Sequence, residues 1–146
     1  MRTIKFRGKR VDNGEWVYGD VMHIFPYKVK IIPHDFNCPE NFARQTTHLV
    51  VHPESVGQFT GLLTKSRKEI FDKDIVGGHP HGTVEVRWND EFATYSGYWS
   101  EKHIDEETGE AVIVEREQMF SNELKDCFNE WEVIGNSFDN PELLKP

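Results

Sequence analysis

Short stretches in which apolar and polar residues alternate recur along the chain, and such alternation is typical of half-buried β-strands. The clearest case is residues 82–88, where we expect Val84, Val86 and Trp88 on one face of a strand. The opposite face then carries Thr83, Glu85 and Arg87. Comparable runs predict strands near residues 3–10, 15–24, 29–32, 48–51, 56–63, 68–71, 92–99, 111–115 and 130–135.

Turn-forming residues separate these runs. Asn13-Gly14 lies between the first two predicted strands and is the strongest short-range signal for a β-hairpin. Residues 34–46 contain turn formers and little periodicity, so they predict a loop. Only residues 117–128 suggest a helix, because their apolar residues recur at steps of three and four. Many short strands with one short helix favour a barrel or a sandwich.

Composition places the chain among globular proteins. It has 146 residues, of which 37% are hydrophobic and 29% charged, and this suits one compact domain. No long apolar run and no apolar segment near the N-terminus is present, so we expect neither secretion nor a membrane span. Cys38 and Cys127 are far apart in the sequence and fit a reduced, cytoplasmic compartment better than a disulfide framework.

The formal net charge of -8 is unevenly distributed. Up to Lys73 there are 12 basic and 8 acidic residues, whereas from Asp74 onward there are 5 basic and 17 acidic ones. These counts give net charges of +4 and -12. A net acidic protein is repelled by phosphate backbones unless its cations cluster on one face. Halves of opposite sign also suit contacts within the chain or between copies of it.

Four segments, in order along the chain, resemble the YopX-like family of small phage and prophage proteins. They are IKFRGKRVDNGEWVYGD (4–20), VGQFTGL with KEIFDKDIV (56–76), GTVEVRW (82–88) and WEVIGNSFDNPELL (131–144). The resemblance implies a β-rich fold that includes an SH3-like barrel, and a tendency to form homo-oligomers. It implies no catalytic residues, because the family has no established activity.

We therefore expect a mainly β protein that forms one domain over residues 1–146. Its SH3-like barrel core would span about residues 53–136, with an N-terminal β-hairpin, additional short strands and one short helix added to it.

Two turns depart from the family pattern, because Ser66-Arg67 and Lys73 stand where it has glycines. A left-handed conformation costs a residue other than glycine about 1 kcal/mol, so we expect these turns to adopt another type. Asp74 is retained, and we expect its short carboxylate to accept nearby backbone N–H groups.

Histidines supply the candidates for a metal site. One set has the spacing H-x3-C-x9-H-x3-H and comprises His34, Cys38, His48 and His52. In a strand, His48 and His52 would lie roughly 13 Å apart and could not share one zinc ion. The second set, His79 and His81, flanks a proline in a predicted turn without a carboxylate nearby in the sequence. We expect neither a metal nor another cofactor.

A basic cluster, Lys65, Arg67 and Lys68, is predicted at the tip of the second hairpin and is a candidate for contact with an anionic partner. Nucleic acid could also stack on the nearby aromatic residues Trp88, Phe92, Tyr95, Tyr98 and Trp99. Residues 89–115 are acidic, however, and aromatic side chains in short strands usually pack in a core.

The sequence thus favours a non-enzymatic binding or assembly protein of a phage or prophage. It would be homo-oligomeric and cytoplasmic, would not bind membranes, and could contact a host or phage protein. One alternative is a nucleic-acid-binding module that uses the basic hairpin and the barrel aromatics. The weakest alternative is a metal-dependent hydrolase that uses His34, Cys38 or the pair His79 and His81.

Overall fold

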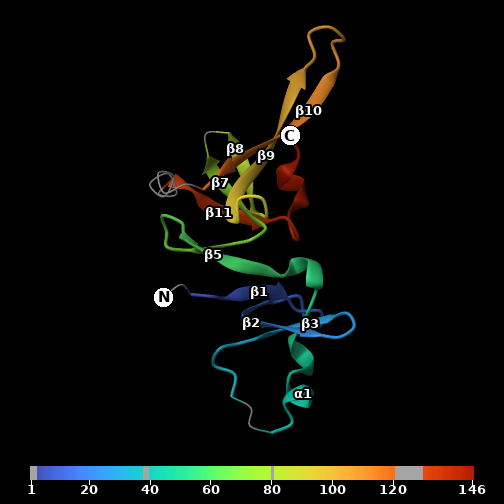
Figure 1. Ribbon diagram of the computed structural model, residues 1–146, viewed down its shortest axis with the longest axis vertical. Coiled ribbons are helices and arrows are strands. Elements are labelled where there is room, and N and C mark those ends of the chain that lie inside the picture. The colour runs from blue at the N-terminus through green and yellow to red at the C-terminus, as the bar shows by residue number, and fades with distance from the viewer. Residues whose placement is uncertain (1–2, 38–39, 80, 121–129) are drawn as a thin grey trace. The chain divides into compact units, whose positions relative to one another are not determined.

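A computed structural model describes residues 3–37, 40–79, 81–120 and 130–146 (Figure 1). Most of the described residues with regular structure are in β-strands, which form two antiparallel sheets, so the mainly β class is confirmed. The chain divides into two compact units, Met1–Gly61 (unit 1) and Leu62–Pro146 (unit 2), and each is described by itself. The single domain and the SH3-like barrel stay predictions.

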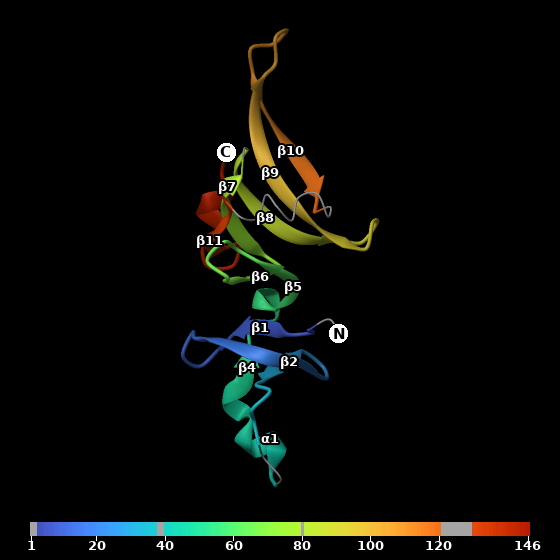
Figure 2. The same ribbon diagram turned by 90° about the vertical axis from the view of Figure 1, so that its left-hand side faces the viewer.

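Unit 1 contains an antiparallel sheet in the order β4-β3-β2-β1-β5 (Figure 2). Its strands are β1 (Phe6–Lys9), β2 (Trp16–Ile24), β3 (Lys28–Ile32), β4 (Val50–Val51) and the beginning of β5 (Gly57–Leu63). The predicted first hairpin is present, and Gly14 supplies the positive φ of 71° that its turn requires. Val29, Ile31 and Val51 form the buried core of this unit.

Two predictions in unit 1 are wrong in part. The stretch 34–46 was expected to be a loop but contains the short helix α1 (Phe42–Gln45). The strand expected at 48–51 is limited to β4, because His48 and Leu49 belong to a 3-10 turn, Thr47–Leu49. A second 3-10 turn, Pro53–Ser55, precedes β5. The Leu49 side chain is buried in this turn, so burial alone did not require a strand.

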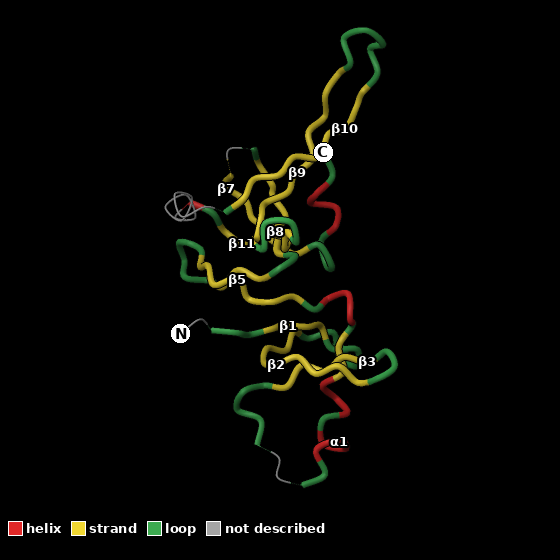
Figure 3. Tube along the Cα trace, in the orientation of Figure 1, coloured by secondary structure: helices red, strands yellow, loops and turns green. Residues whose placement is uncertain are grey.

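Unit 2 contains a five-stranded antiparallel sheet in the order β10-β9-β8-β7-β11 (Figure 3). Its strands are β7 (Asp74–His79), β8 (Gly82–Asn89), β9 (Thr94–Ile104), β10 (Ala111–Met119) and β11 (Glu132–Asn136). The end of β5 leads through a turn into β6 (Glu69–Phe71), and the 3-10 turn η5 (Pro141–Leu144) lies near the C-terminus.

The core of unit 2 confirms the alternation in β8 in part: Val84 and Val86 are both fully buried, but Glu85 is buried as well and Trp88 is exposed. The remaining buried members of this cluster are Ile70, Val76, Tyr95 and Trp131. The Phe120 ring meets the Trp131 ring edge-on, with 5.8 Å between their centroids. Cores of this kind supply most of the favourable free energy of folding.

The helix predicted at 117–128 is wrong for the four residues of it that the structure describes. The first three continue β10, where Gln118 lies opposite Gly97 and Met119 opposite Ser96 of β9, and Phe120 follows outside any helix. Pairing with a neighbouring strand therefore overrides the helical spacing of the apolar residues. Residues 121–128 lie outside the part of the chain that the structure describes.

The turns that lack the expected glycines keep the left-handed conformation, contrary to the prediction. Arg67 has φ of 63° and Lys73 has φ of 69°. In the first turn, the Arg67 N–H donates to the Thr64 carbonyl over 2.9 Å, and the Thr64 N–H donates to the Lys68 carbonyl over 2.8 Å. Such a three-residue hairpin loop has its last residue in the left-handed region. Hairpin geometry therefore imposes the conformation, whatever residue occupies the position.

The prediction for Asp74 is confirmed. Its side chain is buried at the start of β7, and Oδ2 accepts a hydrogen bond of 2.7 Å from the Phe71 N–H. The buried Asp74 side chain thus stabilises the turn between β6 and β7 through a hydrogen bond to its backbone.

Candidate binding site

The turn between β2 and β3 exposes two aromatic side chains. Ile24 pairs with Lys28 across the hairpin, so Phe25, Pro26 and Tyr27 form a three-residue turn beyond the last pair. Phe25 is 95% exposed and Tyr27 is 86% exposed. Neighbouring exposed aromatic side chains, in contrast to single ones, are typical of surfaces that contact another molecule.

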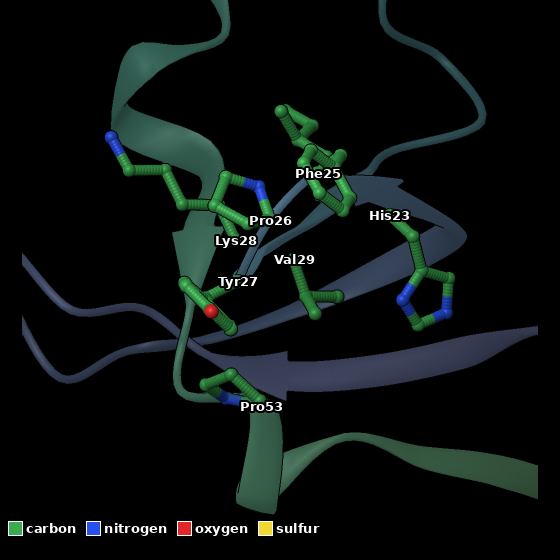
Figure 4. Close-up of a pocket in the computed structure, with 8 residues that line it drawn as sticks. His23, Phe25, Pro26, Tyr27, Lys28, Val29 and Pro53 are labelled. Carbon is green, nitrogen blue, oxygen red and sulfur yellow. The ribbon is translucent and has the colours of Figure 1, made fainter.

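A pocket of about 630 Å³ lies beside this turn (Figure 4). We call it the aromatic pocket, and it is lined by His23, Ile24, Phe25, Pro26, Tyr27, Lys28, Val29 and Pro53. Val29 belongs to the core of unit 1, whereas Pro53 begins the 3-10 turn before β5. A largely apolar pocket with a few polar groups is the usual form of a binding site.

Lys28 and His23 give the aromatic pocket its polar character. Both are exposed, and within the described ranges the Lys28 ammonium and the His23 imidazole make no ion pair or side-chain hydrogen bond. The pocket can therefore receive an apolar group and place a cation beside a carboxylate next to it. Sequence reasoning missed these residues, although Phe-Pro-Tyr between two predicted strands was a usable signal.

A second exposed surface lies at the end of the β9–β10 hairpin. Strand β8 pairs with β9 only along residues 94–98, and residues 99–104 pair with β10 alone in the described part of the sheet. The end of this hairpin is therefore a two-stranded arm (Figures 1 and 2). We call residues 104–113 the acidic tip, since it contains Asp105, Glu106, Glu107 and Glu110.

The acidic tip combines an ordered turn with exposed aliphatic side chains. Asp105 Oδ1 accepts hydrogen bonds from the Glu107 and Thr108 N–H groups, over 2.9 and 2.8 Å. These bonds, that of Thr108 first, lower the pKa of Asp105 below its ordinary value. Ile104 is 61% exposed and Ile113 is 63% exposed. The tip therefore presents apolar groups next to negative charge.

A hydrogen-bonded cluster around Glu101 holds the base of the arm. Its carboxylate accepts from Trp99 Nε1 over 2.9 Å, His103 Nε2 over 3.1 Å and Arg116 Nε over 3.4 Å. The hydrogen bond from Trp99, followed by that from His103, lowers the pKa of Glu101 to about 2. The His81 ring stacks on Trp99 with 4.6 Å between the centroids. This cluster joins β9 to β10.

A further polar network covers the other face of the same sheet. Arg87 lies over the Tyr98 ring, 4.7 Å from its centroid, and donates to Glu115 over 2.9 Å. Asn89 Nδ2 donates to the Tyr98 hydroxyl over 3.2 Å and to Glu117. Burial, followed by the hydrogen bond with Glu117, raises the pKa of Tyr98. The groups satisfy one another, which supports a structural role.

The predicted histidine sets do not form a metal centre in the described residues. His34 Nε2 lies 3.2 Å from Asp20 Oδ1, and His52 Nδ1 lies 3.7 Å from Glu54 Oε1. His48 is in the 3-10 turn, and His81 packs on Trp99. Cys38 and the His79 side chain lie outside what the structure describes. No group of three potential ligands occurs within that part of the chain.

The basic residues Lys65, Arg67 and Lys68 come together on the loop between β5 and β6, and all three are exposed. Ser66 lies between them and donates from Oγ to Glu132 Oε2 over 2.8 Å, which fastens the loop to β11. The loop is therefore both a structural turn and a small cationic surface, with a carboxylate beside it.

The aromatic residues considered for nucleic-acid stacking do not form one exposed surface. Tyr95 is buried, and Trp99 packs against the same core. Trp88 and Phe92 are exposed, but Trp88 Nε1 donates to the Asp90 carboxylate over 3.0 Å. An acidic neighbour is unfavourable for phosphate contact.

A model of the YopX protein family matches residues 5–145, nearly the whole chain, and the protein belongs to this family. The search among curated proteins found no match. Among the described residues, no helix is long and apolar enough to cross a membrane.

Proposed function

We propose that this YopX-family protein is a non-enzymatic binding and assembly module that forms homo-oligomers, acting as a cytoplasmic accessory protein of a phage or prophage. The observation that carries the proposal is the nearly complete exposure of Phe25 and Tyr27 beside the aromatic pocket. Covering exposed aromatic rings with a protein partner removes apolar surface from water, which lowers the free energy. Interfaces are enriched in such residues.

The charge distribution supports contact between copies. Unit 1 contains eight basic and six acidic residues, whereas unit 2 contains nine basic and 19 acidic residues. Their net charges are therefore +2 and -10. Opposite charges on two parts of one chain attract across copies as well, and they guide the encounter of the copies.

Size-exclusion chromatography with light scattering tests this proposal. We expect the full chain at micromolar concentration to have at least twice the mass of one chain, which is 17.1 kDa. A mass of one chain across the accessible concentration range would contradict the assembly role.

Nucleic-acid binding is the second candidate, favoured by the exposed cluster Lys65, Arg67 and Lys68. Fluorescence anisotropy with labelled single-stranded and duplex DNA at low salt tests it. Binding that falls steeply with salt and disappears in Lys65→Glu/Arg67→Glu/Lys68→Glu would support it, because phosphate contacts release counterions. No binding at low salt would reject it.

A further inference from the structure

Two exposed surfaces of the protein have complementary chemistry. The aromatic pocket presents Phe25, Tyr27 and a lysine, Lys28, whose ammonium has no partner in the described ranges. The acidic tip presents Ile104 and Ile113 beside the acidic turn of residues 105–110, and Lys102 lies opposite Ile113. One surface is aromatic with a cation, and the other is aliphatic with anions.

We propose that the acidic tip of one copy docks in the aromatic pocket of a second copy. The inference rests on the proposed assembly function and identifies the two surfaces that carry it. Ile104 and Ile113 of the first copy lie against Phe25 and Tyr27 of the second, and the carboxylates of the tip lie beside Lys28.

The dimensions of the two surfaces suit this contact. The pocket volume of about 630 Å³ is within the range of roughly 300–1,000 Å³ found for pockets that enclose small ligands, so it can hold aliphatic side chains. The tip belongs to a two-stranded arm whose outer residues pair only within the arm, in the described part of the sheet. Its turn is ordered by Asp105, so little conformational entropy is lost on docking.

Among the contacts that two copies could make, the charges favour the pairing of a tip with a pocket. Two pockets would bring Lys28 close to Lys28 of another copy, and two tips would bring carboxylates together. Pairing a tip with a pocket instead places opposite charges in contact. Such a contact is heterologous: each copy keeps one free pocket and one free tip until the assembly closes into a ring or grows further.

Two variants and their mixture test the contact. The pocket variant is Phe25→Ser/Tyr27→Ser, and the tip variant is Ile104→Ser/Ile113→Ser. All four side chains are exposed, so both variants are expected to fold, which circular dichroism checks. We expect each variant to associate about 30-fold more weakly than the unmodified chain, as for loss of an interface hot spot.

An equal mixture of the two variants is the decisive measurement. The pocket variant retains an intact tip and the tip variant an intact pocket, so each pair of chains can form one contact. Light scattering should show dimers containing one chain of each kind and nothing larger, which also demonstrates that both variants are folded.

A charge exchange supplies a second measurement. Lys28→Glu should weaken assembly, and an equal mixture with Glu106→Lys/Glu107→Lys should restore association between unlike chains. The matched control is Glu91→Lys/Glu142→Lys, which makes the same change in net charge at other exposed positions and should not restore it.

The outcomes separate the two proposals. If the unmodified chain is monomeric, the proposed function fails and this contact with it. If the chain is oligomeric and both surface variants remain equally oligomeric, the assembly function stands and the tip-to-pocket contact is wrong. Variants that are monomeric alone and also in the mixture would overturn the contact as well.

Discussion

Individual residues in this protein adopt conformations that their own preferences disfavour. Arg67 and Lys73 have positive φ, where an L-residue other than glycine is strained by about 1 kcal/mol. Neither conformation followed from the sequence, because the residue type argued against it. At Arg67, the length of the loop between the hydrogen-bonded residues Thr64 and Lys68 decided it instead.

We predict that Arg67→Gly is more stable than Lys65→Gly by about 1 kcal/mol in free energy of unfolding. Both substitutions raise the entropy of the unfolded chain, but only the first removes strain, because Lys65 in the same loop lacks a positive φ. Urea denaturation of the two variants measures the difference. Equal stability would show that Arg67 is not strained.

Glu101 gives a pH-dependent prediction at the same scale. Its folded-state pKa of about 2 lies below the ordinary value of 4.5, so its ionised form favours the folded state. This contribution is present above pH 4.5 and is lost as the pH falls toward 2. The stability difference between the unmodified chain and Glu101→Gln should shrink as the pH falls from 4.5 toward 2.

Chemical denaturation at several pH values measures this difference. Glu110→Gln is the control for removal of one negative charge from the same exposed hairpin. A difference for Glu101→Gln that does not change with pH would contradict a role for its ionised carboxylate.

Among the elements, strands were predictable where alternation was regular, and helices were not. The pattern in 82–88 placed Val84 and Val86 in the core because each strand residue alternates between two faces. The strand β10 was predicted too short, since its last residues have helical spacing. Their partners on β9 could not be known from local sequence.

Gly97 lies on β9 opposite Gln118 of β10, and the close packing around it gives a prediction. A Cβ atom at this position would lie 2.6 Å from Val84 Cγ1 and 3.2 Å from Phe120 Cε1, inside the core. We expect Gly97→Ala to reduce the free energy of unfolding by about 1–3 kcal/mol, the usual cost of overpacking. Thermal and urea unfolding measure it.

Gly77→Ala is the matched control for Gly97→Ala. Its Cβ would meet only the exposed side chain of Ile134, at 3.3 Å, and we expect a change within about 0.5 kcal/mol. If the two substitutions changed the free energy of unfolding equally, the side chains around Gly97 would have to move away from the added methyl group without loss of stability.

At the scale of the whole molecule, the sequence revealed the family and the unequal distribution of charge. It did not reveal the aromatic pocket or the acidic tip, which we propose to form the contact between copies. Residue type alone was enough to single out the cationic cluster Lys65, Arg67 and Lys68. Phe25 and Tyr27 lie between the strands predicted at 15–24 and 29–32, but only the register of β2 and β3 shows that they form an exposed turn. Exposure depends on pairing, which a single sequence does not fix.

The charge difference between the units predicts how assembly responds to salt. Raising the salt concentration from about 0.05 to 0.5 M shortens the screening length to a few ångströms, so attraction between opposite charges weakens. Apolar contacts alone would not weaken under these conditions. We therefore expect the dissociation constant, measured by analytical ultracentrifugation, to rise with salt. Lys28→Gln should reduce that dependence, because it removes the cation beside the pocket. A dissociation constant that is unchanged or lower at high salt would leave the apolar side chains as the source of affinity and refute the part assigned to charge.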